Sequence, residues 1–271
     1  MTDALPARDL GTDKMLARKE GGVGWMIFNN PARHNAVSME MWSAAERILA
    51  DFAADPEVRV LVVTGAGGKA FVSGADISKF ESERSSEEAV AAYNAQAARV
   101  YDGLHAFPKP TIAMIRGHCI GGGAALSVCC DIRVCEEGSG FAIPAAKLGL
   151  GYALAGLSRL TNLVGPAFAK EMFFTARRFS AQEAKEMGLV NRVTTADALE
   201  ATVREMADTI AGNAPLTVTS VKRIINEAVK GPAAWDEPAC AALVKACFDS
   251  QDYIEGRRAF MEKRKPVFQG R

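Results

Sequence analysis

The pattern of apolar positions changes its period several times along the first two thirds of the chain. Continuous apolar runs bounded by glycine, proline or asparagine are typical of strands buried on both faces of a sheet. Residues 58–65 form such a run, and residues 23–30, 109–117 and 131–137 are also expected to be strands. Helical spacing replaces them over residues 37–55, with Ser38 as the expected N-cap. Because strands and helices alternate as far as about Asn191, the sequence predicts a parallel α/β core.

Beyond Asn191 the spacing of apolar residues is only helical. Three segments show this period, at residues 198–212, 215–231 and 239–264, and two prolines, Pro215 and Pro232, stand where helices should begin or end. We therefore expect two regions, a core over residues 1–195 and a C-terminal helical region over residues 196–271. The second region is rich in Ala, Val and Met, so we expect it to pack against the core or a second subunit.

Composition narrows the classes of function. Lys and Arg together number 32, as do Asp and Glu, so no net charge draws the chain to nucleic acid or to an anionic membrane. The first residues contain no apolar segment like that of a secretion signal, and no apolar stretch of about 18 residues occurs. We therefore expect a cytoplasmic protein without nucleic-acid or membrane partners.

Cysteine and histidine positions give no indication of a metal centre. None of the six cysteines forms a C-x-x-C pair, and Cys129 and Cys130 lie inside an apolar run, which predicts reduced thiols in a core. The three histidines, His34, His105 and His118, are not spaced to share a metal ion with a carboxylate on one helix face. We expect no metal site.

One glycine-rich segment formally matches a dinucleotide-binding fingerprint. Residues 65–70, GAGGKA, follow a predicted strand as that fingerprint requires. The fingerprint also needs a helix to start on these glycines, whereas Phe71 and Val72 continue in a strand-like pattern. We therefore expect no nucleotide site there.

Two other glycine segments are candidates for an anion-stabilising site. Residues 71–77 (FVSGADI) and 117–127 (GHCIGGGAALS) each run from a strand through glycine towards an expected helix start. Free backbone N–H groups gather at helix starts. Ala75 and Gly122 can then point two N–H groups at one oxygen, which would form an oxyanion hole. The alternative is that both turns need glycine only for packing.

Five collinear segments resemble the crotonase superfamily, the enoyl-CoA hydratase/isomerase family, over nearly the whole chain. They are NNPARHNAVS (29–38), VRVLVVTGAGGKAFVSGADI (58–77), KPTIAMIRGHCIGGGAALSVCCDIRV (109–134), EMFFTARRFSAQEAKEMGLVNRV (171–193) and FMEKRKPVF (260–268). The resemblance implies a spiral of ββα units followed by a helical trimerisation region, as a homotrimer or a hexamer of paired trimers. It also implies an acyl-CoA substrate, with no cofactor beyond its CoA moiety.

The resemblance assigns residues to that substrate. It implies that the thioester oxygen lies between the N–H groups of Ala75 and Gly122. Ser73, which borders the expected oxyanion hole, Gly74 and Gly121 are further candidates for binding CoA. The resemblance also implies that the CoA phosphates contact Arg33 and Lys263 or a nearby basic residue. It implies that adenine contacts the backbone near Ala36, Asp76 and Ile77. Each basic residue alone is also compatible with an ordinary exposed charge.

Three positions depart from the family pattern. A standard hydratase has one glutamate three residues after the middle glycine of its triple-glycine turn and another directly after the proline of an F-x-x-P segment. Here those positions hold Ala125 and Ala145. An aspartate used by family dienoyl isomerases and dehalogenases falls at about Ala153. Because hydration needs a base for water and an acid for the α-carbon, we expect little hydratase activity.

Decarboxylation of a malonyl-type thioester needs no base, because the departing CO₂ leaves its electron pair on the α-carbon. Tyr152 stands in an LG-x-x-Y-x-L-x-G segment that resembles the family's methylmalonyl-CoA decarboxylases. We expect its phenol to orient the carboxylate or help to deliver the proton. The alternative is a core or pocket-lining aromatic. The likeness is partial, because those enzymes carry histidine and glutamate where Ala75 and Ala125 stand.

Three functions therefore remain open. The sequence favours a decarboxylase or another lyase that forms a thioester enolate without the standard glutamates. The second is a hydratase or isomerase whose acid and base stand at unusual positions, such as Glu81 or Glu83. The third is an acyl-CoA-binding protein that has kept the pocket and lost catalysis.

Overall fold

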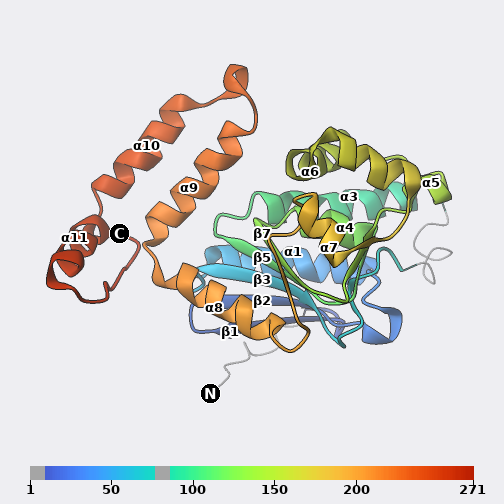
Figure 1. Cartoon of the computed structure of the whole chain (residues 1–271), viewed down its shortest axis with the longest axis horizontal. Coiled ribbons are helices and arrows are strands. Elements are labelled where there is room, and N and C mark those ends of the chain that lie inside the picture. Colours follow the sequence, from blue (N-terminus) through green and yellow to red (C-terminus); the bar gives the residue numbers. More distant parts are fainter. Residues whose placement is uncertain (1–9, 77–85) are drawn as a thin grey trace.

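The structure, a computed structural model, describes residues 10–76 and 86–271. Within them a six-stranded sheet has the order β1-β2-β3-β5-β7-β10 (Figure 1). Its strands are β1 (Met15–Glu20), β2 (Val23–Phe28), β3 (Val60–Gly65), β5 (Thr111–Ile115), β7 (Ile132–Glu136) and β10 (Arg192–Thr194). All neighbours are parallel except β1 and β2. The predicted parallel α/β core is confirmed.

Two strands of this sheet were not expected. β1 forms an antiparallel edge, and β10 lies beyond Asn191, where the sequence predicted helices only. The second prediction was wrong because β10 has three residues, which is too short for an apolar period to show. The strand β10 is stabilised by its parallel pairing with β7, which the local sequence does not reveal.

Helices cover both faces of the large sheet, and this explains the continuous apolar run of β3. Leu61 and Val63 pack in one core cluster with residues of α1 (Met39–Ala54) and α3 (Glu87–His105). Val60 and Val62 pack in a second cluster with α8 (Leu199–Gly212). Alternate side chains of a strand point to opposite faces, so a strand covered on both faces has to be apolar throughout.

A second, smaller sheet has the order β4-β6-β8-β9. Its strands are β4 (Ala70–Val72), β6 (His118–Ile120), β8 (Gly140–Ala142) and β9 (Phe179–Ser180). The first three are parallel and β9 is antiparallel to β8. In sequence, each pair β3-β4, β5-β6 and β7-β8 gives one strand to each sheet and then a helix. This repeat is the expected series of ββα units.

Besides α3, the helices of these units are α4 (Gly122–Val128) and α5 (Ala145–Leu148), followed by α6 (Leu154–Thr175) and α7 (Ala181–Glu186). α3 and α4 lie on the same side of the large sheet as α1, and α5 lies beside α6 (Figure 1). α6 bends at Gly165, whose φ is 72°, directly before Pro166. The predicted helix over residues 37–55 is confirmed as α1, with Ser38 at its N-cap, although the Ser38 side chain accepts no capping hydrogen bond.

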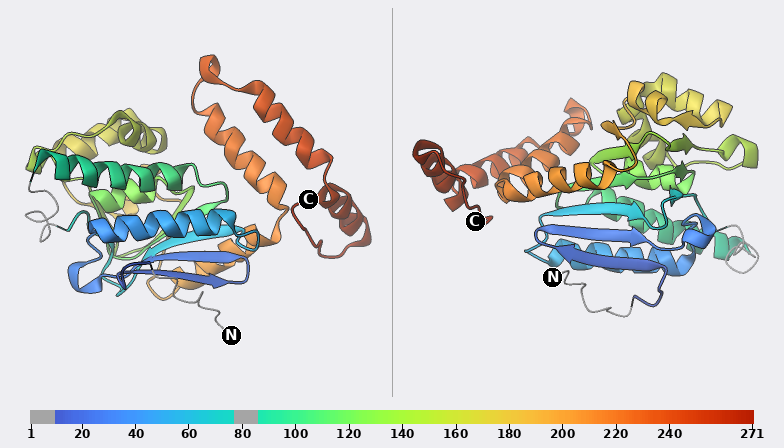
Figure 2. Two further views of the ribbon diagram at one scale, coloured as in Figure 1. Left: turned by 180° about the vertical axis from the view of Figure 1, so that it is seen from behind. Right: turned by 60° about the horizontal axis from the view of Figure 1, so that its bottom comes forward.

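Three further helices form an arm that stands apart from the sheets in all views (Figures 1 and 2). They are α9 (Pro215–Ala228), α10 (Glu237–Phe248) and α11 (Gln251–Glu262). Pro215 begins α9 as expected, and Pro232 begins a 3-10 turn. The helical segment expected over residues 239–264 is divided at Ser250, which caps α11 by accepting a hydrogen bond from Tyr253 N–H.

Two basic side chains tie the arm and the chain end to the rest of the molecule. Lys222 of α9 lies 2.8 Å from the Asp131 carboxylate and donates to the Lys109 carbonyl at 2.9 Å. Arg59 donates to the Ala211 carbonyl at 3.0 Å and to the Phe268 carbonyl at 2.8 Å. These polar contacts hold α9 and the chain end against the part of the molecule that contains the sheets.

Candidate active site

The first glycine turn is held in place by a short β-bridge. Val37 N–H donates to the Gly74 carbonyl at 2.9 Å, and Asp76 N–H donates to the Val37 carbonyl at 3.1 Å. In parallel pairing successive residues direct their backbone groups to opposite sides of the strand. Ala75 therefore directs its N–H away from Val37, to the side where β6 pairs with β4.

The second glycine turn joins β6 to α4. Gly121 has φ 55° and ψ −113°, a conformation open to glycine alone, and its N–H donates to the Ala142 carbonyl at 2.8 Å. Gly122 is the first residue of α4, so its N–H has no partner within the helix. The predicted strand, glycine and helix order is confirmed for this segment.

The two turns lie against each other. A Cβ added to Gly122 would lie 3.6 Å from Gly74 Cα, and one added to Gly74 would lie 3.8 Å from Gly122 N. In the described ranges 10–76 and 86–271, neither Ala75 N–H nor Gly122 N–H donates a hydrogen bond. The arrangement suits two amides that share one acceptor, and the role of this pair as an oxyanion hole stays a prediction.

The positions that hold glutamate in a standard hydratase border the second turn. Ala125 N–H donates to the Gly121 carbonyl at 3.0 Å, one turn into α4. Ala145 is buried at the start of α5, and the preceding Pro144 lies 4.0 Å from the position of a Gly121 Cβ. Ala153 is the N-cap of α6. These sites beside the glycines thus carry methyl groups.

Tyr152 lies in the loop between α5 and α6. Its ring packs edge-to-face on Phe173, with 4.9 Å between ring centroids. Burial raises the pKa of its phenol, because the charged form loses hydration. Among the described residues it forms no hydrogen bond with Ala75 or Gly122. Its predicted role stays a prediction.

Residues assigned to CoA divide between two places. Arg33 ends a 3-10 turn, its side chain is exposed, and its carbonyl accepts a 3.5 Å hydrogen bond from the Ser73 hydroxyl. Ala36 and Asp76 are buried on either side of the Val37 bridge. Ile77 lies outside the described residues, as do Glu81 and Glu83. This part of the assignment gathers beside the first glycine turn.

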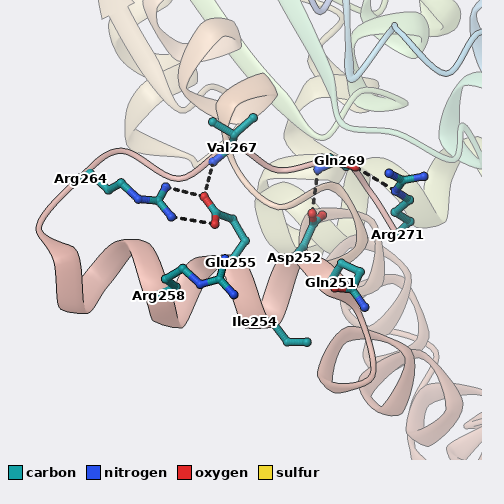
Figure 3. A pocket seen from close by; sticks show the side chains of 9 residues that line it. All are labelled: Gln251, Asp252, Ile254, Glu255, Arg258, Arg264, Val267, Gln269 and Arg271. Carbon is teal, nitrogen blue, oxygen red and sulfur yellow. Dashed lines mark hydrogen bonds and ion pairs between the residues drawn. The ribbon is translucent and has the colours of Figure 1, made fainter.

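Lys263 lies elsewhere. It ends α11 with φ 54°, and α11 stands at the outer end of the arm, away from α4 (Figure 1). Next to α11 a hollow of about 520 Å³ lies between that helix and the chain end (Figure 3). There Asp252 accepts the Gln269 and Gly270 N–H groups, and Glu255 pairs with Arg264. These charges fasten the chain end to α11, and contact between Lys263 and CoA stays a prediction.

Sequence reasoning missed three residues that shape the glycine turns. Asn35, fully buried with φ 56°, donates to the carbonyls of Ala66 and Ala70. Tyr93 donates to the Val37 carbonyl at 2.8 Å. Tyr101 donates to the Gly122 carbonyl at 3.3 Å. Both tyrosines come from α3, and the only available signal was their eight-residue separation, which favours neither role.

The described part of the chain holds no group of three His, Cys, Asp or Glu residues that could bind a metal ion. Residues 66–69 form a bend between β3 and β4, so no helix starts on GAGGKA. The six cysteines are free, and Cys119, Cys129, Cys130 and Cys135 are buried. None of the helices described here has the length and apolar character to cross a membrane.

Similarity to known proteins decides the family. The sequence model of the enoyl-CoA hydratase/isomerase family matches residues 18–271. The chain belongs to this family. This family member is 34% identical over 256 residues to a short-chain-enoyl-CoA hydratase from Clostridium acetobutylicum, covering 93% of the chain and 96% of that protein. It is also 34% identical over 242 residues to a carnitinyl-CoA dehydratase from Citrobacter koseri, covering 88% and 91%.

A solved structure confirms the fold of this family member. An enoyl-CoA hydratase/carnithine racemase from Magnetospirillum magneticum matches it with a TM-score of 0.89 and 36% identity, over 96% of this chain and 97% of that one. The expected crotonase-like architecture is thus correct. The relatives named here are hydratases and a dehydratase, so the expected likeness to a decarboxylase stays a prediction.

Proposed function

We propose that the protein is an acyl-CoA thioester enzyme that stabilises a thioester enolate between Ala75 N–H and Gly122 N–H. Membership of the enoyl-CoA hydratase/isomerase family supports the substrate class. The contact between the two glycine turns supports the position of the oxygen. Donors fixed in advance stabilise developing negative charge without reorganisation, and one such donor is typically worth about 10² to 10³ in rate.

We propose further that the protein catalyses a lyase reaction other than hydration, such as decarboxylation. The observation that carries this choice is the pair of methyl groups, Ala125 and Ala145, beside the glycine turn. A positioned acid or base contributes about 10² to 10⁴ in rate, which is roughly 3 to 5 kcal/mol of barrier at about 1.36 kcal/mol per decade. Water addition needs two such groups.

Decarboxylation makes smaller demands on the protein. The bond between the α-carbon and the carboxylate breaks, CO₂ departs, and the electron pair enters the thioester as an enolate. That charge falls on the oxygen held by the two amides. A proton then adds to the α-carbon. Tyr152 is our candidate for orienting the carboxylate, since its half-buried phenol can donate a hydrogen bond.

A second candidate is a hydratase with displaced acid and base groups. Its support is the family itself, because a relative 34% identical to this chain is a short-chain-enoyl-CoA hydratase. In both cases we propose a cytoplasmic homotrimer or hexamer that needs no cofactor beyond the CoA moiety. Arg33, Ser73 and backbone near Ala36 and Asp76 are proposed to contact that moiety.

Turnover of two substrates separates these candidates. We expect crotonyl-CoA hydration to be at least about 10⁴-fold slower than with the Clostridium hydratase, since two groups worth about 10² to 10⁴ each are missing. We expect CO₂ release from methylmalonyl-CoA, slowed about 10²-fold or more by Tyr152→Phe and unchanged by Tyr253→Phe on the arm. Rapid hydration would establish the second candidate, and binding of both thioesters without turnover would indicate a non-catalytic protein.

A further inference from the structure

The phenol of Tyr101 lies directly beside the proposed oxyanion hole. Tyr101 belongs to α3, and its hydroxyl donates to the Gly122 carbonyl at 3.3 Å. The hydroxyl oxygen would lie 3.1 Å from a Cβ added to Gly122. An ionisable group thus reaches the residue whose N–H is one of the two proposed donors.

A buried aromatic cluster fixes where this hydroxyl stands. The Tyr101 ring packs edge-to-face on Trp42 of α1, with 5.3 Å between centroids. Trp42 in turn packs on Phe28 of β2 at 6.3 Å, and both are almost fully buried. Because the Tyr101 ring packs on Trp42, the Tyr101 hydroxyl has a defined position before any ligand binds. Acid catalysis requires a positioned proton donor of this kind.

The hydrogen bond from Tyr101 to the Gly122 carbonyl is weak. At 3.3 Å it is longer than the range of about 2.5 to 3.0 Å usual for O–H···O bonds. A phenol keeps its proton at neutral pH and its O–H can turn to another acceptor. A substrate atom beside Gly122 can therefore replace this particular bond.

We propose that Tyr101 donates the proton that the α-carbon of the enolate receives. This inference rests on the proposed function, because it requires a thioester held at Ala75 and Gly122. It supplies a proton carrier where Ala125 and Ala145 offer only methyl groups. Tyr152 forms no hydrogen bond with either donor residue in the described ranges, so its phenol is the weaker choice for this step.

This proton transfer needs water as its only further reagent. The O–H bond of Tyr101 breaks and a C–H bond forms at the α-carbon. The electron pair of the enolate double bond makes the new C–H bond, and the thioester C=O re-forms. The phenolate that remains regains a proton from water. In reverse, the phenolate removes a proton from the α-carbon of a saturated thioester.

That reversal gives a test that does not depend on which net reaction the enzyme performs. Propionyl-CoA is incubated in D₂O with the full-length protein, and loss of the α-proton signal is followed by NMR. Calorimetry gives the dissociation constant of propionyl-CoA in parallel. Tyr101→Phe removes the O–H and keeps the ring on Trp42. Tyr253→Phe, on the exposed face of α11, is the matched control.

We expect exchange with the wild-type protein and with Tyr253→Phe, and a loss of about 10² to 10⁴ in rate with Tyr101→Phe. The dissociation constant should stay within about twofold, because Tyr101 acts on the proton and not on binding. A purely structural role would weaken binding and exchange together, and that result would overturn the proposal.

Failure of this inference is distinct from failure of the proposed function. Tight binding with equal exchange by wild type and Tyr101→Phe would reject Tyr101 and leave the proposed function intact. Tight binding without any wild-type exchange would also reject Tyr101 as a proton carrier. If propionyl-CoA and methylmalonyl-CoA both fail to bind, the proposed function falls, and this inference falls with it.

Discussion

The glycines of the GHCIGGG segment serve different purposes. At Gly117 and Gly123 a Cβ would lie 2.0 Å from the carbonyl oxygens of Lys69 and Val72, so the backbone of β4 excludes any side chain there. At Gly121 the backbone conformation itself requires glycine. At Gly122 the three atoms nearest to an added Cβ belong to the Tyr101 hydroxyl and to Gly74, at 3.1 to 3.9 Å. The packing explanation therefore holds for Gly117 and Gly123, and neither Gly121 nor Gly122 shows so close a backbone contact.

Replacing Gly123 by Ala should destabilise the protein. The new methyl would meet the Val72 carbonyl, which belongs to β4 and cannot swing away as a flexible side chain can. We expect the free energy of unfolding, measured by denaturant titration, to fall by about 1 to 3 kcal/mol. Gly156→Ala is the control, because nothing lies within 4 Å of the added Cβ in α6. That change should gain up to about 1 kcal/mol, and equal effects of both substitutions would contradict the close approach.

Single-residue geometry also shows why part of the site escaped sequence reasoning. Ala75 and Gly122 were found from the strand-to-glycine pattern of two segments, and the alanines at 125 and 145 because the family resemblance fixes their places in motifs. Tyr101 was not found, because it stands 21 residues before Gly122 on another helix. Only the packing of Tyr101 on Trp42, which is a tertiary contact, brings its hydroxyl to the glycine turn.

At the scale of elements, helices α9 and α10 of the arm bury fewer residues than α8, the helix that precedes them. The structure buries three residues of α8, which packs on the sheet, but only Ser220 of α9 and none of α10. Large apolar side chains of the arm stay exposed, among them Phe248 at 60%, Phe260 at 83% and Met261 at 80%. Exposed apolar surface on this scale is typical of interaction sites. The expected helical region is thus correct in its elements, and its expected role in oligomerisation stays a prediction.

The arm predicts assembly of several copies in solution. Covering its apolar side chains with a second copy removes them from water, which favours association by about 25 cal/mol for each Å² of apolar surface. We expect a mass of about three or six times the 28.9 kDa of one chain by size-exclusion chromatography with light scattering. Phe260→Asp should reduce that mass, whereas Leu16→Asp, at an exposed position on β1, should not. A wild-type mass of 28.9 kDa would contradict the prediction.

Over the whole molecule, the two sheets differ in how far the sequence predicts them. Strands β2, β3, β5 and β7 of the large sheet were predicted, and helices cover both of its faces, whereas β1 and β10 were not predicted. The strands of the small sheet have two or three residues. The two that precede the glycine turns were expected, but β8, β9 and the pairing of all four strands were not. Their pairing nevertheless sets the site, since β4 and β6 lead directly into the two glycine turns. The parallel core follows from the sequence, and the alignment of the turns follows from the long-range pairing.

The central proposal is that Ala75 and Gly122 hold one thioester oxygen, with the methyl groups of Ala125 and Ala145 at the positions where a standard hydratase has glutamates. A crystal structure of the protein with propionyl-CoA bound tests it most directly. The account predicts the thioester oxygen within about 2.7 to 3.1 Å of both amide nitrogens, with the Tyr101 hydroxyl as the nearest proton-bearing group to the α-carbon. A thioester oxygen bound elsewhere, or an aspartate or glutamate side chain at the α-carbon, would contradict it.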